Sequence, residues 1–303
     1  MTQVLTQAFA LVFIVFLGYV FQRAGWARAE HFAMLTKVVL YVTLPAMLMT
    51  AFNKVDLTPK LLLIPLLSFI LGLSLHIGGW LMERKSPPPE KAFGILNASS
   101  FNVGAFATPY VSLFIGSHAI VYSSLFDVGV TFATAGVAFA WAMAITSETG
   151  RASPLTLIGH MFRSPVFVTY LFLLIMRLFD LHLLPFVVNV ATPIGAANPF
   201  LAMFMIGVGL EVRLRRSKYA KAAKFLAVRY SVLIAVGIAA WFLLPYDHEV
   251  RVILCVVLAS PIAVMTAAFT LQTKGDVELS TFMISASVLV SIVAMPLLFL
   301  ALS

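Results

Sequence analysis

Long apolar runs separated by short charged or turn-forming breaks recur along the whole chain, and they constrain its fold more than any other feature. Most of these runs are at least about twenty residues long, the length an α-helix needs to cross the hydrocarbon core of a bilayer. Of the 303 residues, 61% are hydrophobic and 11% are charged, whereas a soluble domain typically has about 25% charged residues. The mean hydropathy is +1.02. We therefore expect an all-α polytopic membrane protein.

The positions of the breaks predict ten transmembrane helices. The expected spans are 3–22, 32–52, 60–82, 91–115, 118–145, 155–177, 184–210, 219–244, 250–272 and 278–302. The sixth is the least regular, because Arg163 interrupts its apolar run. The first has no basic segment before it, so we expect a retained helix rather than a signal peptide.

This composition excludes several classes of function. No polar segment is long enough for a soluble catalytic or DNA-binding domain, and we expect no nucleic-acid partner despite the formal charge of +8. Cys255 is the single cysteine, so neither an internal disulfide nor a cysteine-based metal site is expected. An intramembrane enzyme would need a nucleophile–base pair or a metal cluster at helical spacing. The sequence shows neither, and it predicts no enzyme, no metal site and no cofactor.

The distribution of lysine and arginine predicts how the chain crosses the membrane. Sixteen of the 20 basic residues, Arg229 among them, lie in or beside the odd-numbered breaks. Cytoplasmic loops carry the excess of positive charge in membrane proteins. We therefore expect the odd-numbered breaks in the cytoplasm and both termini on the outer side.

Matched prolines predict that the chain consists of two related halves. Pro45 and Pro199 are 154 residues apart, and Pro109 and Pro261 are 152 apart. The halves are expected at 1–148 and 154–303, with five spans each. Because five is odd, the second half enters the membrane from the opposite side. Such inverted repeats are typical of transporters, whose binding site lies where the repeats meet.

Pro109 and Pro261 are expected to break the fourth and ninth spans. Proline has no N–H to donate within a helix, so the carbonyls of Ala105 and Val257 should be left without their helical partners. Broken helices persist in a membrane only inside protein or beside water. Their half-helix N-termini attract anions. The alternative is that both prolines form ordinary kinks.

Two polar residues inside the spans are candidates for chemistry. Asn102 precedes Pro109 by seven residues, which places both on one helix face, and its amide is expected either to bind a carboxylate or to bond a neighbouring helix. Asp127 is the only acid well inside an apolar span, and such carboxylates are functional candidates. It is expected to carry a proton, to pair with a cation or to hold a helix in register. The expected substrate-binding residues are Asn102, Thr108, Pro109, Asn198, Ser260 and Pro261.

Several short motifs occur in both halves in a specific order. They are Leu44-Pro45-Ala46, Asn102 to Pro109 with Tyr110 and Gly116, Asp127, Ile206 to Leu210, Ala259-Ser260-Pro261, Gly275-Asp276 and Pro296. With these motifs the chain resembles the auxin efflux carrier family, which includes the plant PIN-formed auxin exporters and bacterial carriers proposed to move malonate, malate and related acids. The chain lacks the long central loop of the plant carriers and has Ser231 where many relatives have proline.

The resemblance to the bacterial carriers implies residence in a bacterial inner (plasma) membrane. It also implies a fold similar to bile-acid transporters and sodium–proton antiporters. In such a fold, spans 4 and 9 cross at their broken centres. Spans 1, 2, 6 and 7 form a scaffold domain, and spans 3–5 and 8–10 form a transport domain that moves as an elevator. Pro109 and Pro261 would form the crossover, with Asn102 as the main polar ligand. A scaffold of this kind favours a homodimer through spans 2 and 7.

The predicted function is secondary active or facilitated transport of a small organic anion, either a mono- or a dicarboxylate. Coupling to protons through Asp127, coupling to sodium through freed carbonyls, and uniport are three open alternatives. A membrane sensor that keeps the carrier fold is the alternative function, because binding without transport would use the same site.

Overall fold

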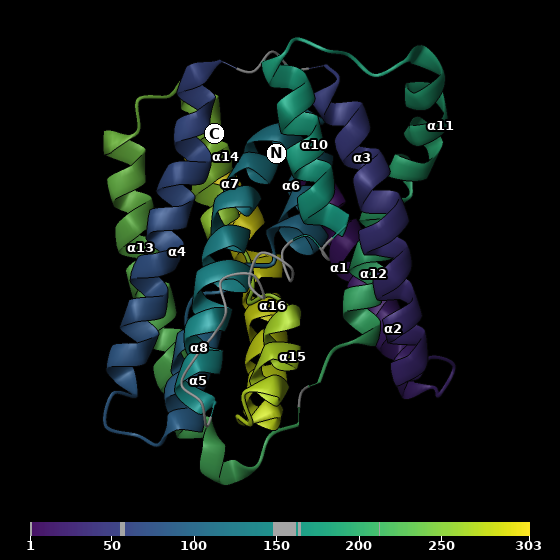
Figure 1. Cartoon of the computed structure of the whole chain (residues 1–303). Coiled ribbons are helices and arrows are strands. Elements are labelled where there is room, and N and C mark those ends of the chain that lie inside the picture. The colour runs from purple at the N-terminus through teal and green to yellow at the C-terminus, as the bar shows by residue number, and fades with distance from the viewer. Residues whose placement is uncertain (1, 55–57, 148–161, 163–164, 212) are drawn as a thin grey trace.

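The computed structural model describes residues 2–303 except 55–57, 148–161, 163–164 and 212. The described residues form helices joined by short turns, with no strand among them (Figure 1). The α-helices are α1 (Thr2–Arg23), α2 (Ala29–Val38), α3 (Leu44–Phe52), α4 (Leu63–Met82), α5 (Pro88–Asn97), α6 (Thr108–Phe114), α7 (Ala119–Thr131), α8 (Phe139–Thr146), α10 (Pro165–Leu178), α11 (Pro185–Ala196), α12 (Asn198–Val208), α13 (Tyr219–Leu243), α14 (His248–Leu258), α15 (Met265–Gln272) and α16 (Val277–Leu302). Wider π-helical turns form η1 (Val39–Thr43), η3 (Val103–Ala107) and η4 (Phe132–Ala138), and tighter 3₁₀ turns form η2 (Pro59–Leu62) and η5 (Arg216–Lys218).

Six of the described helices are long and apolar enough to cross a membrane. They are Glu30–Phe52, Pro59–Met82, Ala119–Thr146, Pro185–Val208, Arg216–Leu243 and Val277–Leu302. Shorter apolar helices cover Phe9–Arg23, Val103–Leu113 and Pro165–Leu178. The expected boundary between the halves, at residues 148–154, and two of the basic residues, Arg151 and Arg163, lie outside the described residues.

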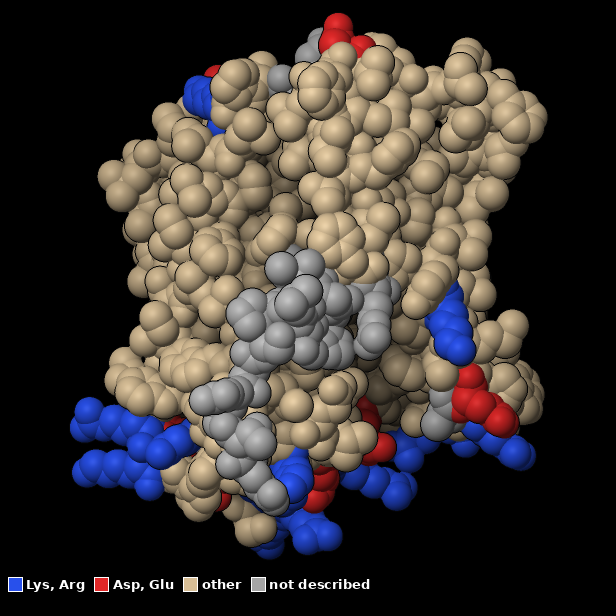
Figure 2. All heavy atoms as spheres, viewed as in Figure 1, with Lys and Arg blue, Asp and Glu red and all other residues tan. Residues whose placement is uncertain are grey.

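Charge separates the two ends of the molecule. The lysine and arginine side chains visible in Figure 2 gather mainly at its lower end, below a broad region in which tan, uncharged residues predominate. Both chain ends lie in the upper part of the molecule in the same view (Figure 1). This distribution matches an integral membrane protein whose two polar surfaces differ in charge.

The helices pack mainly within two groups. In one group α1 packs along α12, and α3 packs on α10 and α11; in Figure 1 most of this group lies on the right. In the other, α4 packs on α5 and α7, and α14 packs on α13 and α16. The first and second groups also touch, for example through α3 and α7.

The two matched prolines of the first half, Pro45 and Pro109, follow π-helical turns instead of breaking their helices. Pro45 is the second residue of α3, directly after η1, and Pro109 is the second residue of α6, directly after η3. In η3 the Thr108 N–H bonds to the Val103 carbonyl, five residues back. A π-turn inserts an extra residue in the ladder, which relieves the clash between a proline ring and the carbonyl behind it. The expected break at Pro109 is therefore misplaced.

The helix of the fourth span is interrupted earlier than expected, at residues 98–102 between α5 and η3. The ninth is interrupted where expected, at 259–264 around Pro261. The Val257 carbonyl is not left free, however. It accepts from both the backbone N–H and the hydroxyl of Ser260, because the chain turns sharply enough after α14 for Ser260 to fold back.

The two interruptions contact each other directly. The Asn102 N–H donates to the Pro261 carbonyl at 2.8 Å, and the Thr266 hydroxyl donates to the Ser100 hydroxyl at 2.7 Å. The Ile262 N–H donates to the hydroxyl of Ser287 on α16 at 2.9 Å. Backbone groups that lost helical partners are thus bonded across the crossing, as the dry interior of a membrane protein requires.

Candidate functional site

A cavity of about 480 Å³ lies beside the crossing of the two interrupted helices. Its wall includes the starts of η3 and α15, with residues 103–105 and 263–265 among its lining. Other lining residues come from α2, η1, α7, η4, α10, α12 and α16. Both groups of helices therefore contribute to it. Most lining side chains are apolar, with a few polar groups among them, the usual make-up of a small-molecule site.

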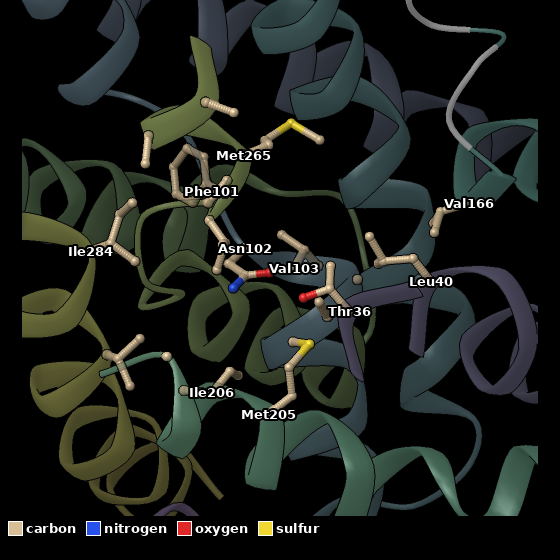
Figure 3. Close-up of a pocket in the computed structure, with 18 of the residues that line it drawn as sticks. Thr36, Leu40, Phe101, Asn102, Val103, Val166, Met205, Ile206, Met265 and Ile284 are labelled. Atoms are coloured by element: carbon tan, nitrogen blue, oxygen red, sulfur yellow. The ribbon is translucent and has the colours of Figure 1, made fainter. Parts of the chain in front are cut away.

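Asn102 presents an unused amide to this cavity. It is the last residue before η3 and is only 6% exposed. Figure 3 shows its side chain among Phe101, Val103 and Thr36, the last of which comes from α2. Within the described chain its Nδ2 atom has no hydrogen-bond partner. An unpaired buried donor costs about 1–3 kcal/mol, so an acceptor oxygen bound in the cavity would relieve that cost.

Asp127 and Tyr170 form a second polar centre on the same cavity. The Tyr170 hydroxyl on α10 donates to Asp127 Oδ2 on α7 at 2.8 Å, and the Thr131 hydroxyl approaches Oδ1 at 3.5 Å. Gly104 makes this arrangement sterically feasible: a Cβ on Gly104 would lie 2.7 Å from Asp127 Oδ2 and 3.1 Å from the Tyr170 oxygen. The acid of one helix group is thus tied to the other group, next to η3.

The structure brings two of the predicted site residues, Asn102 and Asp127, to the cavity and leaves the others outside its lining. Thr108 is fully buried, and in the described chain its hydroxyl has no partner. Ser260 and Pro261 build the crossing through the bonds described above.

Asn198 lies in the packing between α12 and the second span. Its Oδ1 accepts from the Thr43 hydroxyl at 2.7 Å, and its Nδ2 approaches Met47 Sδ at 3.6 Å. Asn198 therefore has hydrogen-bond partners on η1 and α3.

Arg229 was counted with the cytoplasmic charges and not recognised as a buried residue. It is 1% exposed and lies inside the protein, on α13. Only Ala222, Phe225, Arg229 and Leu233 of that helix are buried. Their spacing of three and four residues marks one helix face. This spacing is visible in the sequence and is the signal that could have found the residue.

The cavity holds groups that can interact with an anion. The N-terminal ends of the helical segments that begin at Val103 and Met265 carry partial positive charge, and residues of both ends line the cavity. The free Asn102 amide lies at the first of these ends. Asp127 supplies one carboxyl group that can exist charged or neutral. Together these groups can bind a carboxylate and exchange a proton beside it.

Comparisons with known proteins identify the family of the chain. A relative from Methanothermobacter thermautotrophicus, described as an uncharacterized transporter, is 26% identical over 299 residues, which is 95% of each chain. The family model described as "Membrane transport protein" matches residues 3–299. With crossed helix interruptions, a cavity with a few polar groups beside them and a family match over nearly its whole length, the chain belongs to this membrane transport family, that of the auxin efflux carriers.

Proposed function

We propose that this transporter moves a small organic anion, a mono- or dicarboxylate, through the cavity beside the helix crossing. The observation that carries the proposal is the unpaired amide of Asn102, buried in that cavity at the positive end of a helical segment. A carboxylate satisfies the amide and interacts favourably with the helix end. The volume of about 480 Å³ is within the range of small-molecule sites.

Proton coupling through Asp127 completes the proposal. Its carboxylate lies in the cavity wall, bonded to the Tyr170 hydroxyl. Two negative charges in one dry cavity repel strongly, so a bound carboxylate favours the protonated form of Asp127. The same interaction makes proton and substrate binding mutually supportive, which is the requirement for symport.

The proposed movement is an elevator-type displacement. The scaffold domain comprises α1, α2–α3, α10 and α11–α12, and the transport domain comprises α4–α8 and α13–α16. Helix packing within each group is consistent with this division, and the cavity lies where the groups meet. In this proposal the ten spans form two inverted five-helix repeats, the basic end faces the cytoplasm of a bacterial cell, both termini lie outside, and the scaffold forms a homodimer.

The test is charge movement in proteoliposomes on a solid-supported membrane after rapid addition of malonate, malate, acetate or indole-3-acetate. Loss of one hydrogen bond to a charged ligand costs about 1.5–3 kcal/mol. Asn102→Ala should therefore raise KM about 10- to 100-fold. Asn189→Ala is the matched control, because this asparagine is exposed on α11 and its KM should not change.

An electroneutral cycle moves no net charge, so isotope uptake under a pH gradient accompanies the current measurement. The proposal fails if the wild-type protein gives neither saturable current nor uptake with any of the four acids. It also fails if Asn102→Ala and Asn189→Ala show the same KM.

A further inference from the structure

A buried arginine joins the two interrupted helices at their crossing. One guanidinium nitrogen of Arg229 donates to the Ala98 carbonyl at 3.2 Å, and another donates to the Ser260 carbonyl at 3.1 Å. Ala98 caps the end of α5, and Ser260 follows the cap of α14. A single side chain on α13 thus bonds the carboxyl ends of both half-helices.

The charges at this point balance. Each helix carboxyl end has a partial charge of about −0.5, so two of them together offset one guanidinium. In the described part of the chain no carboxylate lies within ion-pair distance of Arg229. A buried charge is costly unless it is paired. Here the partners are the two carbonyls and the Phe101 ring, whose centroid is 4.7 Å from Cζ.

Half-helix carboxyl ends and unwound carbonyls are the groups that hold a coupling sodium ion in transporters with broken helices. In this chain four carbonyls of this kind are already bonded. The Ala98 and Ser260 carbonyls accept from Arg229, the Ala259 carbonyl accepts from the Ser291 hydroxyl at 2.6 Å, and the Pro261 carbonyl accepts from the Asn102 N–H.

We infer that Arg229 is a built-in cation that takes the place of a sodium ion at the crossing, so that anion transport by this chain requires no sodium. Arg229 acts as a positioning residue. It does not line the cavity, but it packs on Phe101, which does, and Phe101 precedes Asn102. Arg229 offsets the negative ends of α5 and α14. The positive helix ends at Val103 and Met265 then dominate the electrostatic potential in the cavity. The part of this inference that concerns transport rests on the proposed function.

The first experiment needs no variant. Anion-driven current and uptake are measured in wild-type proteoliposomes in sodium, potassium or choline chloride at equal ionic strength. The expected result is that KM and maximal rate agree within twofold in all three salts. A KM that is more than fivefold lower in sodium overturns the inference.

Substitutions separate the charge of Arg229 from its shape. Arg229→Gln removes the charge and should raise KM at least tenfold, whereas Arg229→Lys keeps it and should remain within about threefold of wild type. The inference is refuted if lysine and glutamine are equally impaired, or if KM is unchanged and only the maximal rate falls.

Arg251→Gln is the matched control. Arg251 is partly buried on α14, donates to the Trp241 carbonyl at 3.0 Å and packs on the Trp241 ring. It thus makes the same kinds of contact away from the crossing. Its removal should leave KM unchanged, and a KM rise equal to that of Arg229→Gln contradicts the specific role of Arg229.

A thermal-stability measurement keeps this inference separable from the proposed function. The unfolding temperature of the purified wild-type protein should be the same in sodium, potassium and choline chloride without any substrate. Stabilisation by sodium alone overturns the inference even if no anion is transported. If no anion is transported and the unfolding temperature is the same in all three salts, the proposed function is refuted. The inference that Arg229 takes the place of a sodium ion is then still supported.

Discussion

Adding a single methyl group at Gly104 should push Asp127 away from the helix crossing. Gly104 lies in η3, between the crossing and the cavity, and its missing side chain makes room for Asp127 and Tyr170. We predict that Gly104→Ala strongly impairs transport while the protein still folds into the membrane. The change adds one carbon atom and removes no polar group.

The magnitude follows from the geometry. The new Cβ would lie 2.7 Å from Asp127 Oδ2, and ordinary contacts begin near 3.4 Å, so the carboxylate and the helix must separate by about 0.7 Å. The Tyr170 hydroxyl, at 3.1 Å, must move as well. Overpacking of this kind costs about 1–3 kcal/mol. Weakening the 2.8 Å bond to the carboxylate adds up to about 1.5–3 kcal/mol.

The assay is uptake driven by a pH gradient, compared with substrate exchange at equal pH, in the same proteoliposomes. Loss of about 1.4 kcal/mol changes an equilibrium tenfold, so pH-driven uptake should fall at least tenfold. Gly78→Ala is the control, because a Cβ on Gly78 in α4 meets no atom within 4 Å. Equal pH-driven uptake by Gly104→Ala and wild type would show that the contact between η3 and the acid is irrelevant to coupling.

Three further perturbations test other parts of the structure. Asp127→Asn should abolish pH-driven uptake while substrate exchange persists, and unchanged pH-driven uptake would exclude a proton-carrying role. Asn198→Ala leaves the Thr43 hydroxyl without its 2.7 Å partner; it should lower the free energy of unfolding by about 1–3 kcal/mol, and a raised KM would instead support the predicted role in substrate binding. Partial burial tends to raise the pKa of Asp276, but the hydrogen bonds from Lys218 and from the Leu279 N–H, together with the charges of Lys218 and Lys221, outweigh it and hold that pKa below its usual range. Its stabilisation of the fold is therefore full at neutral pH and lost as the pH falls through the lowered pKa, below about pH 4. The unfolding temperature of wild type should drop over that window more than that of Asp276→Asn, and parallel curves would contradict the ion pair.

The local sequence was sufficient to predict that the chain is a helical membrane protein. A membrane solvates neither charges nor free backbone groups, so hydropathy alone predicts which segments are helical and apolar. Hydropathy also marked Asp127, because an acid inside such a segment is conspicuous. The interruption of the ninth span was located from Pro261, which cannot donate a helical hydrogen bond.

Helix interruptions that depend on contacts with a partner helix were harder to predict from the sequence. The interruption in the fourth span lies at residues 98–102, with no proline in it, because bonds to Pro261 and Thr266 across the crossing replace the helical ones. Pro109 alone predicts a local distortion, and the π-turn before it absorbs that distortion.

Arg229 illustrates the same limit. Counted along the chain, it belongs to a group of basic residues near a helix start and reads as a topology signal. What distinguishes it is that two carbonyls from remote segments, Ala98 and Ser260, meet at its guanidinium. The sequence by itself determined a membrane transporter with polar residues inside its spans, since hydrophobic burial is a local property. Only the tertiary structure decided which of those residues share a cavity and which charge offsets which helix end, since these depend on contacts between segments far apart in the chain.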